Sequence, residues 1–277
     1  MAAANIPSDE YEEFGRFLED ACGIVLGQNK HYLVISRLQR LMKDTEFSSL
    51  SDILEELRQN RGGALRTRLI DAMTTNETLW FRDIYPFDVL TNQIFPKLVE
   101  KKITSPRIWS AACSTGQEAY SICMAYREFL AKMPGAFSGQ LRVIGTDISP
   151  TVLQEAKNGI YDPITISRGL SEERKKRFFR EVDGNYEAVD EIRRYTEFRD
   201  LNLMQNYSML GKFDIIFLRN VLIYFSSDLK RDILDRVSRL LNPGGYLFLG
   251  SSESIAKYSD AFEMVRCKPG VVYLLKD

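Results

Sequence analysis

Histidine is nearly absent from this chain of 277 residues, in which His31 is the one example. A Ser-His-Asp triad or a Cys-His pair would therefore have to use that single residue, and a metal site with two or more histidines is excluded. The sequence thus favours a chemistry that needs no imidazole base.

Cysteine pairs and long apolar runs are lacking as well. The four cysteines are Cys22, Cys113, Cys123 and Cys267, and no two of them have the CxxC spacing of redox or zinc sites. No run reaches the ~18 apolar residues of a membrane-spanning helix, and the first residues lack the basic and apolar regions of a signal peptide. We therefore expect a cytoplasmic protein with reduced thiols and no direct membrane insertion.

Net charge is also close to zero, with 37 basic and 38 acidic residues, so no overall field favours nucleic acid. Two stretches nevertheless contain basic residues and no acid, namely residues 28–43 and 57–68. Their basic residues are Lys30, Arg37, Arg40, Lys43, Arg58, Arg61, Arg66 and Arg68. Such charges usually form a solvated helix face, and the alternative is a docking surface for an acidic partner.

The pattern of apolar residues divides the chain into two parts. Apolar residues recur at helical spacing through the first seventy or so residues, whereas strands alternate with helices from about Arg107. The expected strands are 107–112, 141–146, 213–218 and 246–249, followed by a terminal hairpin of 262–265 and 271–275. This alternation predicts a doubly wound α/β sheet whose ligand lies at the carboxyl ends of the strands.

One stretch departs from this alternation. Two short strand candidates flank Asp183-Gly184, which is a hairpin signal. We therefore expect a small antiparallel β-subdomain inserted at about 172–198.

The turn after the first strand indicates the kind of ligand. It reads Ala111-Ala-Cys-Ser-Thr-Gly-Gln-Glu118 and has one glycine, so it is not the glycine-rich turn of a dinucleotide site. S-adenosylmethionine has no phosphate and suits such a turn. Asp147 ends the second strand, where it could accept hydrogen bonds from ribose hydroxyls or simply cap the following helix.

Four segments occur in an order that resembles the CheR family of bacterial chemotaxis receptor methyltransferases. They are residues 74–82 (TTNETLWFR), 109–121 (WSAACSTGQEAYS), 145–149 (GTDIS) and 219–225 (RNVLIYF). The resemblance runs over essentially the full length. It implies a class I S-adenosylmethionine-dependent methyltransferase with a Rossmann-like doubly wound sheet, a small all-helical N-terminal domain and the inserted β-subdomain. Residues 1–73 would be the substrate-docking domain, 74–93 a linker that contributes to the cofactor site, and 94–277 the α/β domain.

The resemblance also implies an activity and its partners. The methyl group of S-adenosylmethionine would pass to glutamate side chains on the cytoplasmic helices of chemoreceptors, leaving S-adenosylhomocysteine, with no metal and no nucleic acid. We expect a monomer that serves chemotactic adaptation. In some relatives the inserted hairpin tethers a receptor peptide, but the short loop at Asp183-Gly184-Asn185 argues against tethering here.

The family's site residues map onto matching positions of this chain. The expected cofactor contacts are Asn76, Thr78, Arg82, Glu118, Asp147, Asn202, Leu203, Asn220 and Val221; the catalytic pair is Arg82 and Tyr224; and the docking residues are Arg37, Arg40 and Lys43. Several have simpler explanations. Glu118 would stabilise a helix dipole, Tyr224 would be a half-buried aromatic, Asn76 a capping residue and Asn202 a turn residue.

The implied reaction agrees with the shortage of histidine. A glutamate side chain has a reference pKa of about 4.3, so it is already an ionised nucleophile at neutral pH. Two alternatives remain, a nucleic-acid methyltransferase and a noncatalytic module that binds S-adenosylmethionine. An adenine N6 enzyme would need a Pro-Pro-aromatic segment after the 213–218 strand, where this chain has Asn220-Val-Leu-Ile-Tyr224, and a cytosine C5 enzyme would need a cysteine there.

Overall fold

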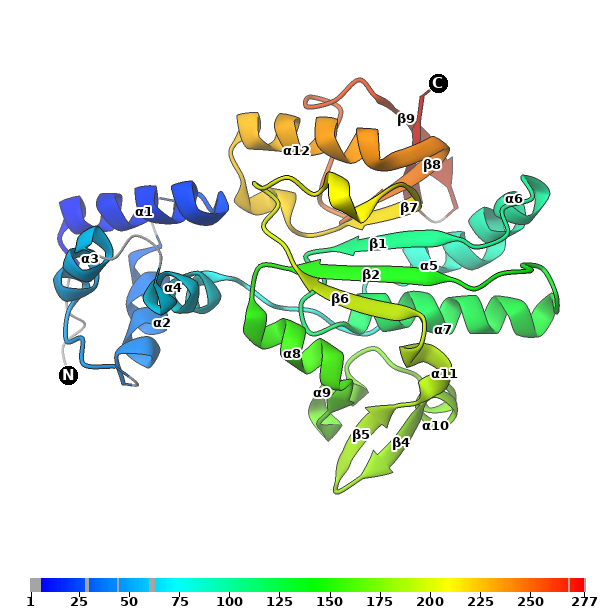
Figure 1. Cartoon of the computed structure of the whole chain (residues 1–277), viewed down its shortest axis with the longest axis horizontal. Helices are drawn as coiled ribbons and strands as arrows, with labels where there is room; N and C mark the ends of the chain where they lie inside the picture. Colours follow the sequence, from blue (N-terminus) through cyan, green and yellow to red (C-terminus); the bar gives the residue numbers. More distant parts are fainter. Residues whose placement is uncertain (1–5, 28–29, 44, 60–62, 269, 277) are drawn as a thin grey trace.

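The computed structural model describes residues 6–27, 30–43, 45–59, 63–268 and 270–276 (Figure 1). Arg61, one of the basic residues noted above, lies outside these ranges. None of the helices in the described ranges is long and apolar enough to cross a membrane.

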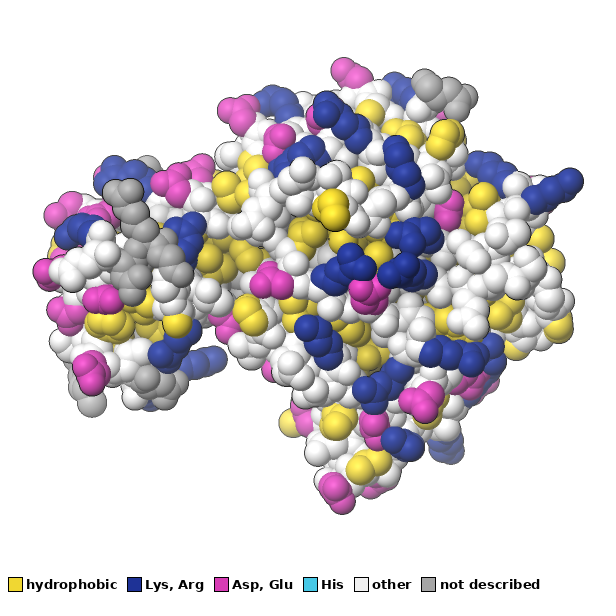
Figure 2. All heavy atoms as spheres, in the orientation of Figure 1, with side chains coloured by type: hydrophobic (Ala, Val, Ile, Leu, Met, Phe, Trp, Pro, Cys, Tyr) yellow, Lys and Arg dark blue, Asp and Glu magenta, His cyan; other side chains and the backbone are white. Residues whose placement is uncertain are grey.

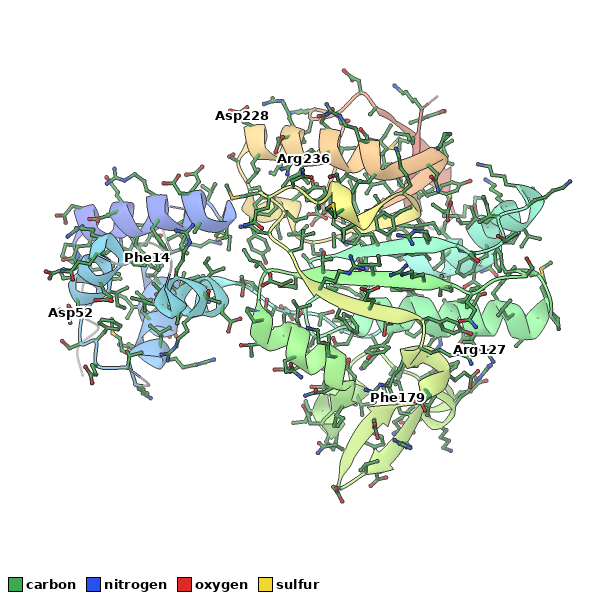
Figure 3. All side chains as sticks on the ribbon, in the orientation of Figure 1. Phe14, Asp52, Arg127, Phe179, Asp228 and Arg236 are labelled. Atoms are coloured by element: carbon green, nitrogen blue, oxygen red, sulfur yellow. The ribbon has the colours of Figure 1, made fainter. Side chains whose placement is uncertain are left out.

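Four helices at the start of the chain, α1–α4, form what we call the helical domain. They are α1 (Ser8–Cys22), α2 (His31–Lys43), α3 (Leu50–Gln59) and α4 (Ala64–Met73). Their apolar stripes meet in a separate core that includes Phe14, which Figure 3 labels, together with Val34 and Ile53. The expected helical first part is therefore present, and Figure 1 shows it to one side of the sheet.

Gly23 ends α1 where the helical domain meets the rest of the chain. Its φ of +77° is the left-handed conformation that favours glycine. A Cβ atom there would lie 2.4 Å from Leu229 Cδ2, so the close approach also requires glycine.

The large sheet has the strand order β6-β2-β1-β7-β8-β10-β9. Its members are β1 (Arg107–Ala111), β2 (Arg142–Asp147), β6 (Thr196–Asp200), β7 (Phe213–Leu218), β8 (Leu241–Leu249), β9 (Phe262–Cys267) and β10 (Gly270–Leu275). The first five strands of that order are parallel, and β10 is antiparallel to both of its neighbours. The doubly wound sheet and the terminal hairpin are thus confirmed.

Helices cover both faces of this sheet, which explains the continuous apolar runs of its central strands. The helices are α5 (Tyr85–Val89), η1 (Leu90–Ile94), α6 (Phe95–Glu100), α7 (Gln117–Lys132), α8 (Pro150–Asn158) and α12 (Ser227–Leu240), with short turns η2 (Ser208–Leu210) and η3 (Leu222–Tyr224). Successive strand residues belong to different cores: Ile215 and Phe217 pack with α5–α7, whereas Ile216 and Leu218 pack with α12.

The small antiparallel sheet differs from the expected range at both ends. Its order is β3 (Ile160–Tyr161), β5 (Asn185–Ala188) and β4 (Phe179–Val182), with the hairpin turning at Asp183-Gly184 as predicted. Helices α9 (Pro163–Ser167), α10 (Glu172–Phe178) and α11 (Asp190–Arg193) accompany it. β3 precedes the 172–198 range, whereas residues 196–198, inside that range, belong to β6 of the large sheet.

Two further boundaries also differ. Residues 85–93 of the expected linker are helical, because α5 begins at Tyr85. Residues 241–245, which precede the expected strand 246–249, also belong to β8, whose pairing with β7 has a register shift. Within the rest of the linker, Trp80 packs against the small sheet: its ring lies 5.1 Å from that of Phe179, and its Nε1 donates to the Thr165 carbonyl at 3.1 Å.

Candidate active site

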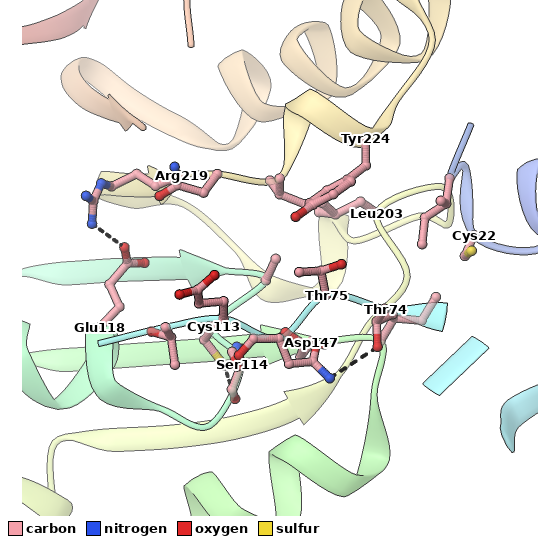
Figure 4. A pocket seen from close by; sticks show the side chains of 18 of the residues that line it. Cys22, Thr74, Thr75, Cys113, Ser114, Glu118, Asp147, Leu203, Arg219 and Tyr224 are labelled. Carbon is pink, nitrogen blue, oxygen red and sulfur yellow. Dashed lines mark hydrogen bonds and ion pairs between the residues drawn. The ribbon is translucent and has the colours of Figure 1, made fainter. Parts of the chain in front are cut away.

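A cleft opens at the carboxyl ends of β1, β2, β6 and β7 (Figure 4). All of the expected cofactor residues line it, as does Tyr224, although they come from segments more than a hundred residues apart. The helical domain closes one side with Cys22, Ile24 and Met73. The structure therefore brings together every residue of the expected cofactor and catalytic sets.

The loop after β1 has a backbone shape that few residues adopt. Ala112, Ser114 and Gly116 have φ values of +53°, +50° and +92°. A Cβ on Gly116 would lie 3.0 Å from that of Ala156. Ser114 Oγ donates to the carbonyl of Asn76 at 2.8 Å, which fixes the loop against the linker.

Asp147 supports that loop from the end of β2. Its two carboxylate oxygens accept the backbone N–H groups of Ser114 (2.8 Å) and Ser149 (3.0 Å). Burial raises the pKa of Asp147, and these hydrogen bonds oppose the rise. The capping residue of α8 is Ser149, which accepts from the Val152 N–H, so Asp147 is not the helix cap.

Glu118 lies on the first turn of α7 and is tied to two strands. One oxygen accepts from Ser110 Oγ at 2.7 Å, and the other is paired with Arg219 Nη1 at 2.8 Å (Figure 4). Arg219 Nη2 is also paired with Asp83 Oδ2 at 2.7 Å and donates to the Arg82 carbonyl at 2.8 Å. Sequence analysis gave Arg219 only as part of a motif and assigned it no role.

Arg82 and Asn76 lie on the linker that crosses the cleft. Arg82 Nη1 donates to the carbonyl of Glu77 at 2.9 Å, and the side chain is half-buried. Asn76 Nδ2 donates to Thr74 Oγ1 at 3.2 Å, while the backbone N–H of Thr74 closes the last turn of α4. The helix ends at Thr74, so Asn76 is not its capping residue.

Asn220 is held in an unusual backbone conformation after β7. Its φ is +59°, and its N–H donates to Glu253 Oε2 at 2.7 Å; the same oxygen accepts from the Gly250 N–H at 2.8 Å. A Cβ on Gly250 would lie 2.6 Å from Asn220 Nδ2. Sequence reasoning missed Glu253 because nothing in its spacing from Asn220 indicates the contact.

Asn202 and Tyr224 connect the cleft to the helical domain. Asn202 Oδ1 accepts from the Met204 N–H at 2.9 Å, which is the expected turn role, and Nδ2 donates to the Ala21 carbonyl at 2.8 Å. The Tyr224 carbonyl accepts from the Val25 N–H at 2.9 Å, while its ring extends from η3 into the cleft (Figure 4).

The expected docking residues on α2 have different environments. Arg40 and Lys43 are exposed. Arg37 instead donates through Nη1 to the carbonyls of Met73 and Thr74 and through Nη2 to Thr75 Oγ1, the last two at 2.9 and 2.8 Å. The docking role of Arg37 stays a prediction, and the structure adds that its guanidinium binds the start of the linker.

On the face that Figure 2 shows, basic and acidic side chains are interspersed. The single histidine stacks on Tyr11 with ring centroids 3.7 Å apart, outside the cleft. In the described residues no group of three or more histidine, cysteine or carboxylate side chains could hold a metal ion.

Comparisons with known proteins agree with this geometry. Residues 9–74 match a family model described as the CheR methyltransferase all-alpha domain, and residues 76–271 match the CheR methyltransferase SAM binding domain. Three curated relatives cover most or all of the chain. Chemotaxis protein methyltransferase 1 of Vibrio cholerae is 50% identical over 277 residues and that of Pseudomonas aeruginosa 49% over 278, each covering both chains completely. The chemotaxis protein methyltransferase of Borreliella burgdorferi is 34% identical over 257 residues, 91% of this chain and 90% of the relative.

Proposed function

The chain belongs to the CheR methyltransferase family, and we propose that it methylates glutamate side chains on the cytoplasmic helices of chemoreceptors. It is an S-adenosylmethionine-dependent methyltransferase. The observation that carries the proposal is the single cleft lined by the expected cofactor residues together with Arg82 and Tyr224.

The residues of the cleft fit the cofactor. S-adenosylmethionine supplies an electrophilic methyl group on a sulfonium when it is bound. We assign the carboxylates of Glu118 and Asp147 to its amino and hydroxyl groups, because a carboxylate accepts several hydrogen bonds. Leu203 and Val221 supply apolar wall, and Asn76, Thr78, Asn202 and Asn220 supply polar contacts around it.

The methyl acceptor would need placement more than activation. Arg82 can orient a glutamate carboxylate with its guanidinium, and Tyr224, which also lines the cleft, can donate a hydrogen bond to it. Correct alignment alone can supply roughly 7–11 kcal/mol of a reaction barrier. Burial raises the pKa of the nearby Cys113 thiol well above its usual value, so that side chain stays protonated and is a poor nucleophile.

Receptor docking is assigned to the outer side of α2. Arg40 and Lys43 are exposed and positively charged, which suits an acidic, glutamate-bearing helix. Arg37 is left out of this surface because of its contacts with the linker. We propose that the protein acts as a monomer in the cytoplasm.

The test is methyl transfer from radiolabelled S-adenosylmethionine to membranes that contain chemoreceptors. We expect base-labile label on the receptor, since carboxyl methyl esters hydrolyse in base, and no label on a receptor whose acceptor glutamates are changed to alanine. Arg82→Ala should remove transfer and leave the circular dichroism unchanged. Tight binding of the cofactor without any transfer would overturn the proposal.

The docking surface is tested by a separate variant. The double variant Arg40→Ala/Lys43→Ala should raise the KM for receptor about tenfold while the KM for S-adenosylmethionine stays unchanged, because rim charges act mainly on association. An unchanged receptor KM at low ionic strength would remove α2 from the docking surface.

A further inference from the structure

One guanidinium at the base of the cleft is bound to two carboxylates and a carbonyl. The Arg219 side chain is only 1% exposed, although it is charged. Its Nη1 is paired with Glu118, and its Nη2 is shared by the Asp83 carboxylate and the Arg82 carbonyl. Three elements are thereby joined: the end of β7, the first turn of α7, and the loop that carries Arg82.

The Arg82 loop has no regular secondary structure to hold its shape. Phe81, Asp83 and Ile84 have φ values of +50°, +67° and +55°, a region that side chains with a Cβ rarely adopt. Such a backbone persists only where its surroundings fix it. The hydrogen bond of Arg219 to the Arg82 carbonyl and its ion pair with Asp83 fix this segment from within the cleft.

The same guanidinium determines the orientation of Glu118. That carboxylate is 13% exposed and has Ser110 Oγ and Arg219 Nη1 as its hydrogen-bond partners. Two fixed partners, one on each oxygen, leave this carboxylate little freedom to turn. Arg219 therefore holds the Glu118 carboxylate in one orientation at the cleft.

We propose that Arg219 is a positioning residue. It holds the cofactor-binding carboxylate of Glu118 and the loop that carries Arg82 in fixed positions relative to each other. This inference rests on the proposed roles of Glu118 and Arg82. It does not require Arg219 to touch either substrate. Its consequence is that two contacts of one side chain affect different steps. The Arg219–Glu118 contact, which we call the Glu118 arm, affects cofactor binding. The Arg219–Asp83 contact, which we call the Asp83 arm, affects the methyl-transfer step.

The two arms can be separated with isosteric variants. Glu118→Gln weakens the first arm, and we expect the Kd for S-adenosylhomocysteine, measured by calorimetry, to rise about tenfold or more. Asp83→Asn weakens the second arm, and we expect kcat to fall about tenfold with that Kd within twofold of the wild-type value. A small displacement of a group near the reacting atoms can cost up to about 100-fold in rate.

Arg219→Lys keeps the charge but cannot reach three partners in the geometry of a planar guanidinium. We expect it to show both defects together, a raised Kd and a lowered kcat. The matched control is Arg231→Lys on α12, because Arg231 pairs with Asp228 at 2.7 Å but is 53% exposed. Neither parameter should change in that control.

The outcomes distinguish this inference from its premises. If Arg219→Lys changes both parameters by less than twofold, the inference is overturned. It is also overturned if Asp83→Asn raises Kd as much as it lowers kcat, since the arms would then not be separate. If the wild-type protein binds S-adenosylhomocysteine but transfers no methyl group to receptor, the proposed substrate fails, while the Kd values still test the Glu118 arm.

Discussion

Two arginines stabilise the cleft from different parts of the molecule and by different means. Arg219, from the end of β7, is enclosed and paired with two carboxylates. Arg37, from α2 of the helical domain, is half-buried and bound to two backbone carbonyls and a hydroxyl. The comparison shows that the same side chain can act as a counter-ion in one place and as a multiple hydrogen-bond donor in another.

The partners decide what the loss of each arginine leaves behind. The Asp83 and Glu118 side chains are 27% and 13% exposed, and without Arg219 both lose their paired cation. Without Arg37, neutral carbonyls remain that water can reach, since Thr74 and Thr75 line the open cleft. The free energy of unfolding should therefore fall much further in the first case.

The largest effect is expected for Arg219→Met. Leaving a buried ionic group without its partner typically costs about 3–5 kcal/mol, and we expect a loss of that size in urea unfolding at pH 7. Arg231→Met, the same change at an exposed pair, should cost less than about 1 kcal/mol. Equal losses in the two variants would show that the burial of Arg219 contributes nothing.

Arg37→Ala should have a smaller effect on stability and a visible one on the cofactor. The lost hydrogen bonds should cost about 1–3 kcal/mol, and the KM for S-adenosylmethionine should rise because the linker is less well held. Arg40→Ala on the same helix should leave both quantities unchanged. A similar rise in KM for Arg40→Ala would contradict the distinction between the bound side chain of Arg37 and the exposed one of Arg40.

Asp71→Asn tests a second side-chain contact between the helical domain and the rest of the chain, this time made by a carboxylate. The Asp71 carboxylate accepts from Ser149 Oγ and from Thr151 Oγ1, the latter at 2.7 Å, and so ties α4 to the start of α8. An amide keeps one acceptor, so we expect a loss of about 1 kcal/mol in unfolding free energy. A loss as large as that of Arg219→Met would mean that the charge of a contact, and not its burial, determines how much unfolding free energy it contributes.

The smallest effect is expected at a surface cluster and depends on pH. Arg142, followed by Arg199, lowers the pKa of Glu197. A lowered folded-state pKa gives stability that is present above the unfolded value of 4.5 and is lost as the pH falls through the folded value. Glu197→Gln should therefore cost less than about 1 kcal/mol at pH 7, and the difference from wild type should shrink as the pH falls below 4.5. If the difference in unfolding free energy between Glu197→Gln and wild type grew as the pH fell, this prediction would be contradicted.

The strands and helices that sequence analysis found are those with strong apolar patterns. The strand at 213–218 is buried throughout, so its run of apolar residues is unmistakable. Thr196–Asp200 was missed as a strand of the large sheet because it lies at the edge, where its residues are half-buried or exposed and its sequence is mostly polar. Edge strands have one partner and need less apolar surface.

The candidate site was predicted through family resemblance, and its supporting residues were not. Arg219 meets Glu118 and Asp83 across 101 and 136 positions of sequence, a separation that no local pattern reveals. The linker contacts of Arg37 were not predicted for a similar reason. Helical spacing places it on a polar side of α2, but it does not show that the linker returns to that side.

The contacts between the helical domain and the rest of the chain have a consequence for how the two parts could diverge. Arg37 binds the carbonyls of Met73 and Thr74, Asn202 binds that of Ala21, and Tyr224 accepts the N–H of Val25. The partners that the helical domain supplies to these bonds belong to its backbone: every amino acid provides the carbonyl, and every one except proline provides the N–H. The outer surface of the helical domain is therefore free to change its specificity residue by residue, or to be exchanged whole in a chimaera, without rebuilding the junction, provided that an arginine stays at position 37, an aspartate at position 71 and a glycine at position 23.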